Sequence, residues 1–247
     1  MHYSIENINK ERLPSHIAVI MDGNGRWAKK MGRSRIFGHQ QGIKTVRKMV
    51  EAAAETGIKY LTLFTFSTEN WQRPPKEITA LMGLLSKTIK GELTSLLKNN
   101  IRLNVIGDYG RLPDAVKKEI DEAMFKTQNN TGLTLIMAIS YSAKWDIVNT
   151  TKKIALLVSD NKLQIQDVNE ELFTKMLSTG IYPFPELLIR TSGEYRLSNF
   201  LLWELAYTEM FFSRKNWPEF EKEDFYEALI NYQKRERRFG KVSEQLN

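Results

Sequence analysis

An apolar run of strand length that ends abruptly in a polar, glycine-rich loop is the feature that most limits how this chain can fold. Residues 17–21 read Ile-Ala-Val-Ile-Met, which is typical of a buried strand, and Asp22-Gly23-Asn24-Gly25-Arg26 follows at once. The aspartate is a hard oxygen ligand that suits Mg²⁺, the glycines let backbone N–H groups approach an anion, and the arginine adds charged donors. A simple turn between a strand and a helix explains the same residues equally well, so other parts of the chain must decide.

Strands and helices alternate along the sequence. Apolar runs predict strands near residues 16–21, 60–66, 101–106, 133–139, 187–190 and 209–213. Helical periodicity predicts helices near 38–56, 76–99, 112–128, 145–159, 169–177, 198–207 and 222–238. This alternation indicates an α/β fold with a mostly parallel sheet. No linker, repeat or shift of composition divides the 247 residues, so we expect one domain over 1–247, with 1–14 as an N-terminal extension and about 222–247 as a C-terminal helix and basic tail.

Composition narrows the class of protein. The chain has no cysteine, which excludes a disulfide framework and thiolate catalysis. No apolar run approaches the roughly 20 residues of a membrane-spanning helix, and residues 1–14 lack a signal-type apolar core, so we expect a cytoplasmic protein that is soluble or peripheral to a membrane. A net charge of +7 favours an anionic partner, either nucleic acid, an anionic membrane or a phosphorylated substrate. The densest basic cluster, residues 234–241, is for most of its residues better explained as a solvated helix face.

Three polar loops follow predicted strands, at residues 22–26, 67–75 and 190–199. Ligands of parallel sheets bind outside the carboxyl ends of the strands, so these loops are expected to converge on one site. Ser67 or Thr68 could simply cap a helix. Arg190 and Arg196 flank Thr-Ser-Gly and precede a serine and an asparagine, a donor set expected for a diphosphate clamp, although surface ion pairs are the alternative.

His39 is the remaining polar candidate, and a long apolar helix lies between the second and third loops. The histidine could act as an acid, a base or a phosphate donor, but a lone histidine is more often structural. The sequence holds neither a His-Glu-x-x-His zinc motif nor a nucleotide P-loop. Leucine, isoleucine and methionine recur at helical spacing over 76–99, which suits either ordinary core packing or the wall of a lipid-binding cavity.

Together, the segments at 21–39, 64–74 and 187–212 resemble the cis-prenyltransferases, and among them most of all the bacterial undecaprenyl diphosphate synthases. The resemblance spans roughly residues 15–240 and is specific, because several long motifs occur in the family's order and spacing. It implies a butterfly-like fold with a six-stranded, mostly parallel sheet surrounded by helices, and a hydrophobic product tunnel walled by the helix at 76–99 and the one before it. It also implies a homodimer that uses Mg²⁺ and adds isopentenyl diphosphate to an allylic primer such as farnesyl diphosphate.

The resemblance also assigns roles to individual residues. Asp22 matches the metal-linked catalytic aspartate, Asn70 a catalytic position, and Glu209 a second acidic residue associated with Mg²⁺. The family positions around the allylic diphosphate correspond to Gly23, Asn24, Gly25, Arg26, Trp27, Arg35 and His39. A flexible motif that orders around substrate is matched by Ser67, Thr68, Glu69, Asn70, Trp71 and Arg73. The isopentenyl diphosphate clamp is matched by Arg190, Arg196 and Ser198.

Two places depart from the family pattern. Residues 140–144 read Ser-Tyr-Ser-Ala-Lys where Asn-Tyr-Gly-Gly-Arg is common, so two glycines and an arginine fork are missing and loop movement or substrate affinity can differ. Glu186 stands where aspartate is usual. Leu133 is large and apolar and would suit a tunnel floor that limits products to about eleven isoprene units, a length implied by the resemblance. A carrier lipid for cell-wall glycans such as peptidoglycan, released by transient contact with the membrane surface, is the implied product.

Three other classes of protein fit the sequence less well. A trans-prenyltransferase would be helical and carry aspartate-rich Asp-Asp-x-x-Asp motifs, whereas this chain has no adjacent aspartates. A non-catalytic subunit of the same family is expected to lack the metal aspartate and parts of the diphosphate clamp, and both are present. A nucleic-acid-binding module rests only on net charge and scattered aromatic residues, so we expect no nucleic-acid partner.

Overall fold

Six parallel strands form one sheet at the centre of the protein. The computed structural model describes residues 3–236. The sheet has the order β3-β4-β2-β1-β5-β6, and every neighbouring pair is parallel. Its strands are β1 (His16–Ile20), β2 (Tyr60–Ser67), β3 (Arg102–Ile106), β4 (Thr134–Tyr141), β5 (Leu187–Arg190) and β6 (Glu209–Phe212). The parallel α/β sheet predicted from the alternating pattern is therefore confirmed.

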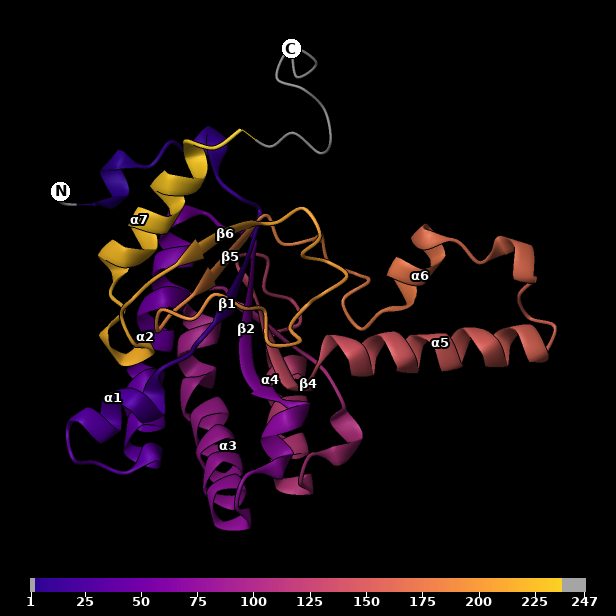
Figure 1. Cartoon of the computed structure of the whole chain (residues 1–247), viewed down its shortest axis with the longest axis horizontal. Coiled ribbons are helices and arrows are strands. Elements are labelled where there is room, and N and C mark those ends of the chain that lie inside the picture. The colour runs from indigo at the N-terminus through magenta and orange to yellow at the C-terminus, as the bar shows by residue number, and fades with distance from the viewer. Residues whose placement is uncertain (1–2, 237–247) are drawn as a thin grey trace.

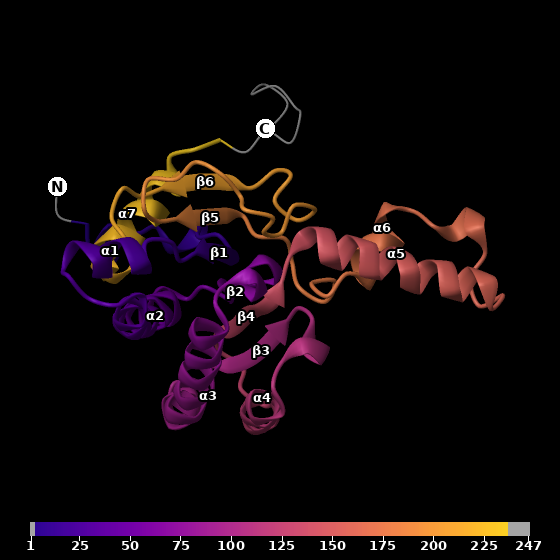
Figure 2. The same cartoon turned by 60° about the horizontal axis from the view of Figure 1, so that its bottom comes forward.

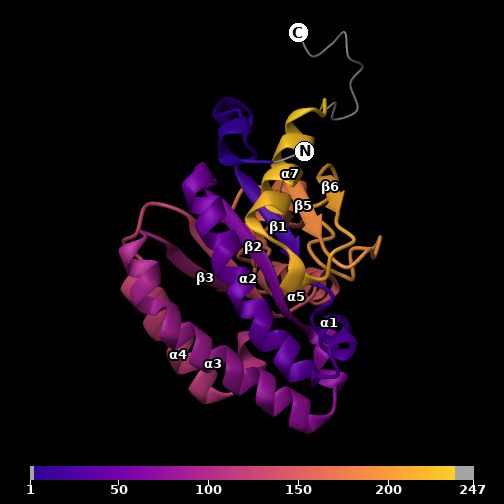
Figure 3. The ribbon, with the colours of Figure 1, turned by 90° about the vertical axis from the view of Figure 1, so that its left-hand side faces the viewer.

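The helices are distributed unevenly around the sheet (Figure 1). They are α1 (Asn24–Lys30), α2 (Arg35–Thr56), α3 (Pro75–Lys98), α4 (Asp114–Thr127), α5 (Ala143–Ser159), α6 (Glu170–Met176) and α7 (Lys222–Gln233). In Figure 3, α2, α3 and α7 lie in front of the strands and cover one face. Figure 2 shows α5 running away from the sheet with α6 beside it, so these two helices form a projection. No helix in residues 3–236 is long and apolar enough to cross a membrane.

Each face of the sheet has its own apolar layer, because successive strand residues point to opposite sides. One set of strand residues packs with α2, α3, α4 and α7 and includes Ile17, Val19, Leu61, Leu63, Leu135, Leu187 and Ile189. The alternate residues, including Ala18, Ile20, Ile136, Ala138 and Leu188, pack against Phe200, Leu201 and Leu205. Strands buried on both sides are therefore continuously apolar, which is why the run at 17–21 was a reliable signal.

The helix predicted over 198–207 is wrong. That segment consists of turns and bends, and Ser198, Asn199 and Leu201 have φ values of 52°, 61° and 46°. Left-handed backbone at three of four consecutive positions is incompatible with a right-handed helix. The apolar residues that suggested a helix instead cover the second face of the sheet from an irregular segment.

The short helix α1 was missed by the sequence analysis, and two glycines of α2 hold it in place. A β-carbon at Gly38 would lie 2.1 Å from the carbonyl oxygen of Asn24, and one at Gly42 would lie 2.4 Å from the side-chain oxygen of Asn24. The two helices can therefore pack closely only because α2 lacks side chains there. This contact fixes the loop that carries Asp22 against the body of the protein. At the other end of the chain, α7 ends at Gln233, and residues 237–247 of the predicted basic tail lie outside the described residues.

Candidate active site

The three predicted loops meet at the carboxyl edge of the sheet, at the mouth of a cavity of about 660 Å³. The mouth is polar, with Asp22 and Asn24 after β1, Ser67, Glu69, Asn70 and Arg73 after β2, and Arg190, Arg196, Ser198 and Asn199 from β5 onward. The interior is apolar and lies between the sheet and helices α2 and α3. The expected convergence is confirmed for these residues.

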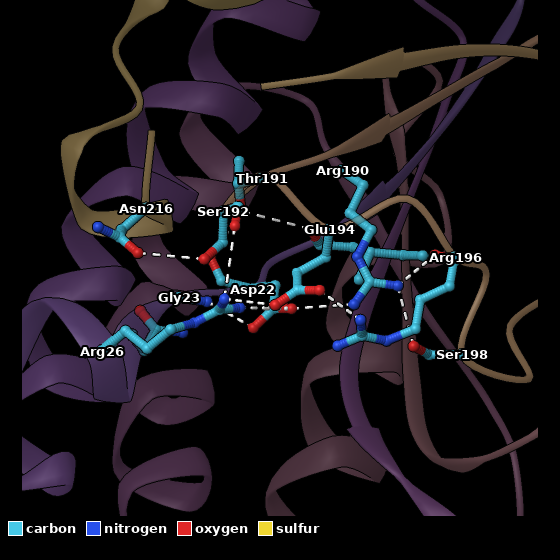
Figure 4. A network of polar contacts seen from close by, with 12 residues as sticks. Asp22, Gly23, Arg26, Arg190, Thr191, Ser192, Glu194, Arg196, Ser198 and Asn216 are labelled. Carbon is cyan, nitrogen blue, oxygen red and sulfur yellow. Dashed lines mark hydrogen bonds and ion pairs between the residues drawn. The ribbon is translucent and has the colours of Figure 1, made fainter. Parts of the chain in front are cut away.

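Arg190 and Asp22 form the centre of the polar mouth (Figure 4). Ile20 of β1 and Arg190 of β5 are register partners in the sheet. Arg190 therefore lies beside the end of β1, which Asp22 closely follows. The guanidinium of Arg190 is only 3% exposed; its Nη2 donates to Oδ2 of Asp22 at 2.9 Å and its Nη1 to Oγ of Ser198 at 2.9 Å. Burial alone would raise the pKa of Asp22, but hydrogen bonds from Arg190 and Arg26 outweigh it and hold that pKa below its usual value. Asp22 is thus an ionised carboxylate at neutral pH.

A second carboxylate, Glu194, joins the arginines of two separate segments. Arg26 donates from Nη2 to Asp22 at 3.0 Å and from Nη1 to Oε1 of Glu194 at 2.5 Å. Arg196 donates from Nη1 to the other carboxylate oxygen of Glu194. The sequence analysis did not single out Glu194, although its position as the one acidic residue between Arg190 and Arg196 was visible.

The glycine-rich loop is shaped by Gly23, whose φ of 102° favours glycine. A β-carbon there would lie 2.6 Å from Oδ1 of Asn216. The backbone N–H of Gly23 donates to the carboxylate of Asp22 at 2.7 Å. Gly25 lies against Arg35, where a β-carbon would be 3.3 Å from Nε. Trp27 stacks on Phe37 at 5.9 Å between ring centroids and, like Arg26 and Arg35, does not line the cavity, so its contact with substrate stays a prediction.

His39 lies in the cavity wall near a second group of arginines. Arg73 and Arg35 share the carboxylate of Glu77, at 3.2 and 3.6 Å. Burial, followed by the charges of Arg73 and Arg35, lowers the pKa of His39 to about 4. His39 is therefore neutral at pH 7 and can serve as a hydrogen-bonding group rather than as a cation.

The segment that leaves β2 at Ser67 and continues in a 3-10 helix (Thr68–Gln72) is held by side chains from the end of β4, the start of α5 and the loop after β5. Thr68 donates to Ser142 at 2.8 Å, and the indole N–H of Trp71 donates to Ser140 at 2.9 Å. Asn199 donates to Glu69 at 2.7 Å. The serines that replace the family's usual residues at 140–144 thus provide hydrogen bonds to the loop that carries Asn70. The side chain of Asn70 accepts from the backbone N–H of Ser67 at 3.2 Å.

Helix α3 supplies much of the apolar wall, with Leu81, Met82, Leu84 and Leu85, and α2 contributes Ile43 and Val46. The strand residues of the wall include Leu63, Leu135 and Met137. Leu133 is 3% exposed and packs in the core, but it is not among the residues that line the cavity. The structure therefore does not place Leu133 at a cavity floor; Leu135, two residues further along and inside β4, lines the cavity and is the nearer candidate.

Glu209 is not brought to Asp22 within this chain. It begins β6, pairs in register with Leu187 at the start of β5, and accepts from Arg235 at 2.7 Å. Asp22 follows the opposite end of β1. Residues 3–236 contain no group of three or more histidine, aspartate or glutamate side chains that could hold a metal ion alone. The single carboxylate of Asp22 beside the arginines nevertheless fits Mg²⁺, which is usually bound by one or two carboxylates together with substrate phosphates and water.

The other departure from the family pattern lies away from the cavity. Glu186 accepts from the backbone N–H of Ser15 at 2.5 Å and from the hydroxyl of Tyr232 at 3.3 Å. Lys144 is exposed at the start of α5, where its backbone N–H donates to Asn199 at 3.0 Å. Neither change removes a side chain from the polar mouth.

Comparisons with known proteins agree with this geometry. A family model described as "Putative undecaprenyl diphosphate synthase" matches residues 20–240. An isoprenyl transferase from Chlorobaculum tepidum is 55% identical over 234 residues, which cover 95% of this chain and 88% of the relative. A farnesyl-diphosphate-specific ditrans,polycis-undecaprenyl-diphosphate synthase from Haemophilus ducreyi is 50% identical over 95% of this chain and 97% of its own length.

A solved structure shares the fold at close to full length. Lavandulyl diphosphate synthase from Lavandula x intermedia, in complex with dimethylallyl diphosphate, superposes with a TM-score of 0.91. The two chains are 37% identical, and the match covers 94% of this chain and 100% of the other. The parallel sheet and these matches together exclude the helical trans-prenyltransferase alternative.

Proposed function

Because this chain belongs to the undecaprenyl diphosphate synthase family of cis-prenyltransferases, we propose that it condenses isopentenyl diphosphate units in cis onto farnesyl diphosphate. The product is a long-chain polyprenyl diphosphate, undecaprenyl diphosphate by its relatives' names, and would serve as a carrier lipid for cell-wall glycans. One observation carries the proposal: an arginine-rich polar mouth opens directly into an apolar cavity of about 660 Å³. A diphosphate head and a growing apolar tail need these two environments side by side.

The residues at the mouth have separate tasks in the reaction. Arg26, with the N–H groups of Asn24 and Gly25 in the loop that Gly23 shapes, binds the primer diphosphate and stabilises its negative charge as the allylic carbon–oxygen bond breaks. Arg190, Arg196 and Ser198 hold isopentenyl diphosphate so that its double bond faces the allylic carbon. Holding two reactants at the right distance removes much of the entropic barrier. The loss of one proton then completes the condensation.

The loop of Ser67 to Arg73 covers the reacting groups in this proposal. Asn70 is too weak a base to accept the proton itself, so a phosphate oxygen or a group positioned by Asn70 takes it. Glu69 and Trp71 hold the loop through Asn199 and Ser140. If Asn70→Ala left the condensation rate unchanged at saturating substrate, this positioning role would be wrong.

Asp22 is the residue that would hold Mg²⁺, together with oxygens of the bound diphosphate. Its ionised carboxylate lies at the mouth and is 28% exposed, so it is accessible to an incoming ion. When bound, the ion neutralises diphosphate oxygens and makes the leaving group better. Glu209 could join only from another copy of the chain, since it begins a strand at the opposite end of the sheet.

A homodimer and peripheral membrane contact complete the proposal. The projection of α5 and α6, with the segments between and after them, exposes Leu156, Ile165 and Ile181 at 65%, 71% and 80%, and we propose that a second copy of the chain covers them. Sedimentation equilibrium tests the dimer. We propose that the protein works in the cytoplasm and delivers its apolar product by transient contact with the membrane surface, which flotation with lipid vesicles would detect.

The test of the activity is incorporation of labelled isopentenyl diphosphate into butanol-extractable lipid, with farnesyl diphosphate, in the presence and absence of Mg²⁺. We expect long products that require Mg²⁺ and are absent with Asp22→Asn. Chromatography of the dephosphorylated products gives their length. Folded protein that makes no lipid under these conditions would favour a partner-dependent subunit and contradict the proposal.

A further inference from the structure

Glu194 connects Arg26 with Arg196, two arginines that bind different diphosphates in the proposed function. One carboxylate oxygen accepts from Arg26, in α1, and the other accepts from Arg196, in the loop after β5 (Figure 4). These arginines are 170 positions apart in the chain and meet only because β1 and β5 are neighbours. A carboxylate that bridges two guanidinium groups presents its oxygens much as a phosphate group does.

The contacts of Glu194 differ from those of an ordinary structural carboxylate. Among residues 3–236, Arg26 and Arg196 are the groups that bind it, and its side chain is 27% exposed. Asp22, in contrast, also accepts from the backbone of Gly23 and from the buried Arg190. Glu194 can therefore leave its partners without exposing buried polar groups, whereas Asp22 cannot.

The charge of Glu194 opposes substrate. Arg196 and then Arg26 hold the pKa of Glu194 below its usual range, so the side chain is ionised wherever the enzyme would work. A diphosphate oxygen that approaches Arg26 or Arg196 meets a negative charge already placed on the same donors. Either the diphosphate displaces the carboxylate, or the two anions stay close together at a cost in binding energy.

We propose that Glu194 is an intramolecular competitor for both diphosphate sites and couples their occupancy. This inference rests on the proposed function. A diphosphate bound to Arg26 repels Glu194 and releases it from Arg196 as well, because one carboxylate serves both arginines. The second site is then free of its competitor, so the first substrate favours binding of the second, and the reverse must hold to the same degree.

The first test measures binding without turnover. Inorganic diphosphate is titrated by calorimetry into the full-length protein and into Glu194→Gln, which keeps the shape of the side chain and removes its charge. We expect diphosphate to bind the variant about three- to tenfold more tightly, the range of one or two exposed ion pairs. Glu122→Gln on α4, which loses a carboxylate paired with Lys126, is the control for net charge and should bind like the unmodified protein.

Equal or weaker binding by Glu194→Gln would overturn the inference and make Glu194 a scaffold for the arginines. Glu194→Asp, which keeps the charge, should bind diphosphate more weakly than the glutamine variant; equal affinity of these two variants would overturn the electrostatic competition. Unmodified protein that neither binds diphosphate nor incorporates isopentenyl diphosphate would instead contradict the proposed function itself.

The second test addresses coupling. The affinity for isopentenyl diphosphate is measured with and without a saturating allylic thiodiphosphate, which is too unreactive to condense. We expect the analogue to improve that affinity more in the unmodified protein than in Glu194→Gln. In steady-state assays the variant should show a lower KM for isopentenyl diphosphate without a higher kcat. The same coupling in both proteins, or a higher KM in the variant, would refute the proposal.

Discussion

The pairing of Asp22 with Arg190 predicts a specific pattern of stability in a double-mutant cycle. The variants are Asp22→Ala, Arg190→Met and the combination of both. Asp22→Ala leaves a guanidinium group that is 3% exposed without its nearest carboxylate, whereas the double variant has neither charge. Removing one partner of a buried pair is costly, but replacing both with apolar groups often is not.

The magnitude follows from burial. Breaking a fully buried ion pair costs about 3–5 kcal/mol; Asp22 is 28% exposed, so we expect about 2–3 kcal/mol for Asp22→Ala. Arg190→Met should cost about 1–2 kcal/mol, because Asp22 keeps its bond to Arg26. The double variant should be less destabilised than the sum by about 1–2 kcal/mol, the coupling typical of residues in contact.

Urea unfolding followed by circular dichroism measures these free energies, and the exposed pair of Glu171 and Lys175 on α6 serves as a control that should show no coupling. Because the folded-state pKa of Asp22 lies below its ordinary value of 3.8, its contribution is complete above that pH and is lost as the pH falls below it. The difference between wild type and Asp22→Ala should therefore shrink only in strong acid. Additive free energies at pH 7 would refute the claim that Asp22 compensates the buried charge of Arg190.

Three further predictions concern the cavity, the loop and the pH response. Leu135→Ala should lengthen the products more than Leu133→Ala, because only Leu135 lines the cavity; chromatography of dephosphorylated products would show the reverse order if that geometry were wrong. Ser142→Ala removes the N-cap of α5 and the hydrogen-bond acceptor of Thr68, so it should lower the free energy of unfolding by about 1 kcal/mol and raise the KM for isopentenyl diphosphate. An unchanged KM would show that Ser142 does not act through the loop that carries Asn70. Burial lowers the pKa of His16 to about 4, so the free energy of unfolding should fall by about 3 kcal/mol on account of this group as the pH falls from 6.5 to 4. Urea unfolding of His16→Gln should show a smaller fall over that range than wild type.

The sequence was sufficient for the strands but not for every helix. All six strands lie within a few residues of their predicted places, because runs such as residues 17–20 are buried on both faces and carry no competing pattern. The segment 198–207 has helix-like apolar spacing, yet left-handed residues such as Ser198 and Leu201 make it irregular. Local sequence does not show that these apolar side chains serve the second face of the sheet. Helix α1 has only seven residues, begins with Asn24 and Gly25, which are weak helix formers, and has no side-chain cap. The sequence therefore contains none of the usual signals of a helix start there.

The candidate site was predictable where chemistry depends on residue type and less so where it depends on contact. Asp22, Arg190 and Arg196 were recognisable because arginines and an aspartate at the ends of parallel strands are the residue types expected to bind a diphosphate, and all three line the cavity. The role of Glu194 was not, since an acidic residue between two arginines suggests only surface ion pairs. Whether Leu133 or Leu135 lines the cavity depends on how α2 and α3 pack over the sheet, which no periodicity determines.

The position of the site follows from the strand order, which the sequence did not reveal. From β1 the chain passes through α2 on one face to reach β2, whereas from β5 it passes through residues 200–205 on the other face to reach β6. Neighbouring strands whose connections leave to opposite sides open a crevice at their carboxyl ends, which is where ligands of such sheets bind. Asp22 and Arg190 are the residues at that crevice, and the apolar cavity under α2 and α3 begins beside it. The topology therefore places the charge that would ionise the primer next to the space that would receive the product, so lengthening that space by mutation should leave diphosphate binding unchanged.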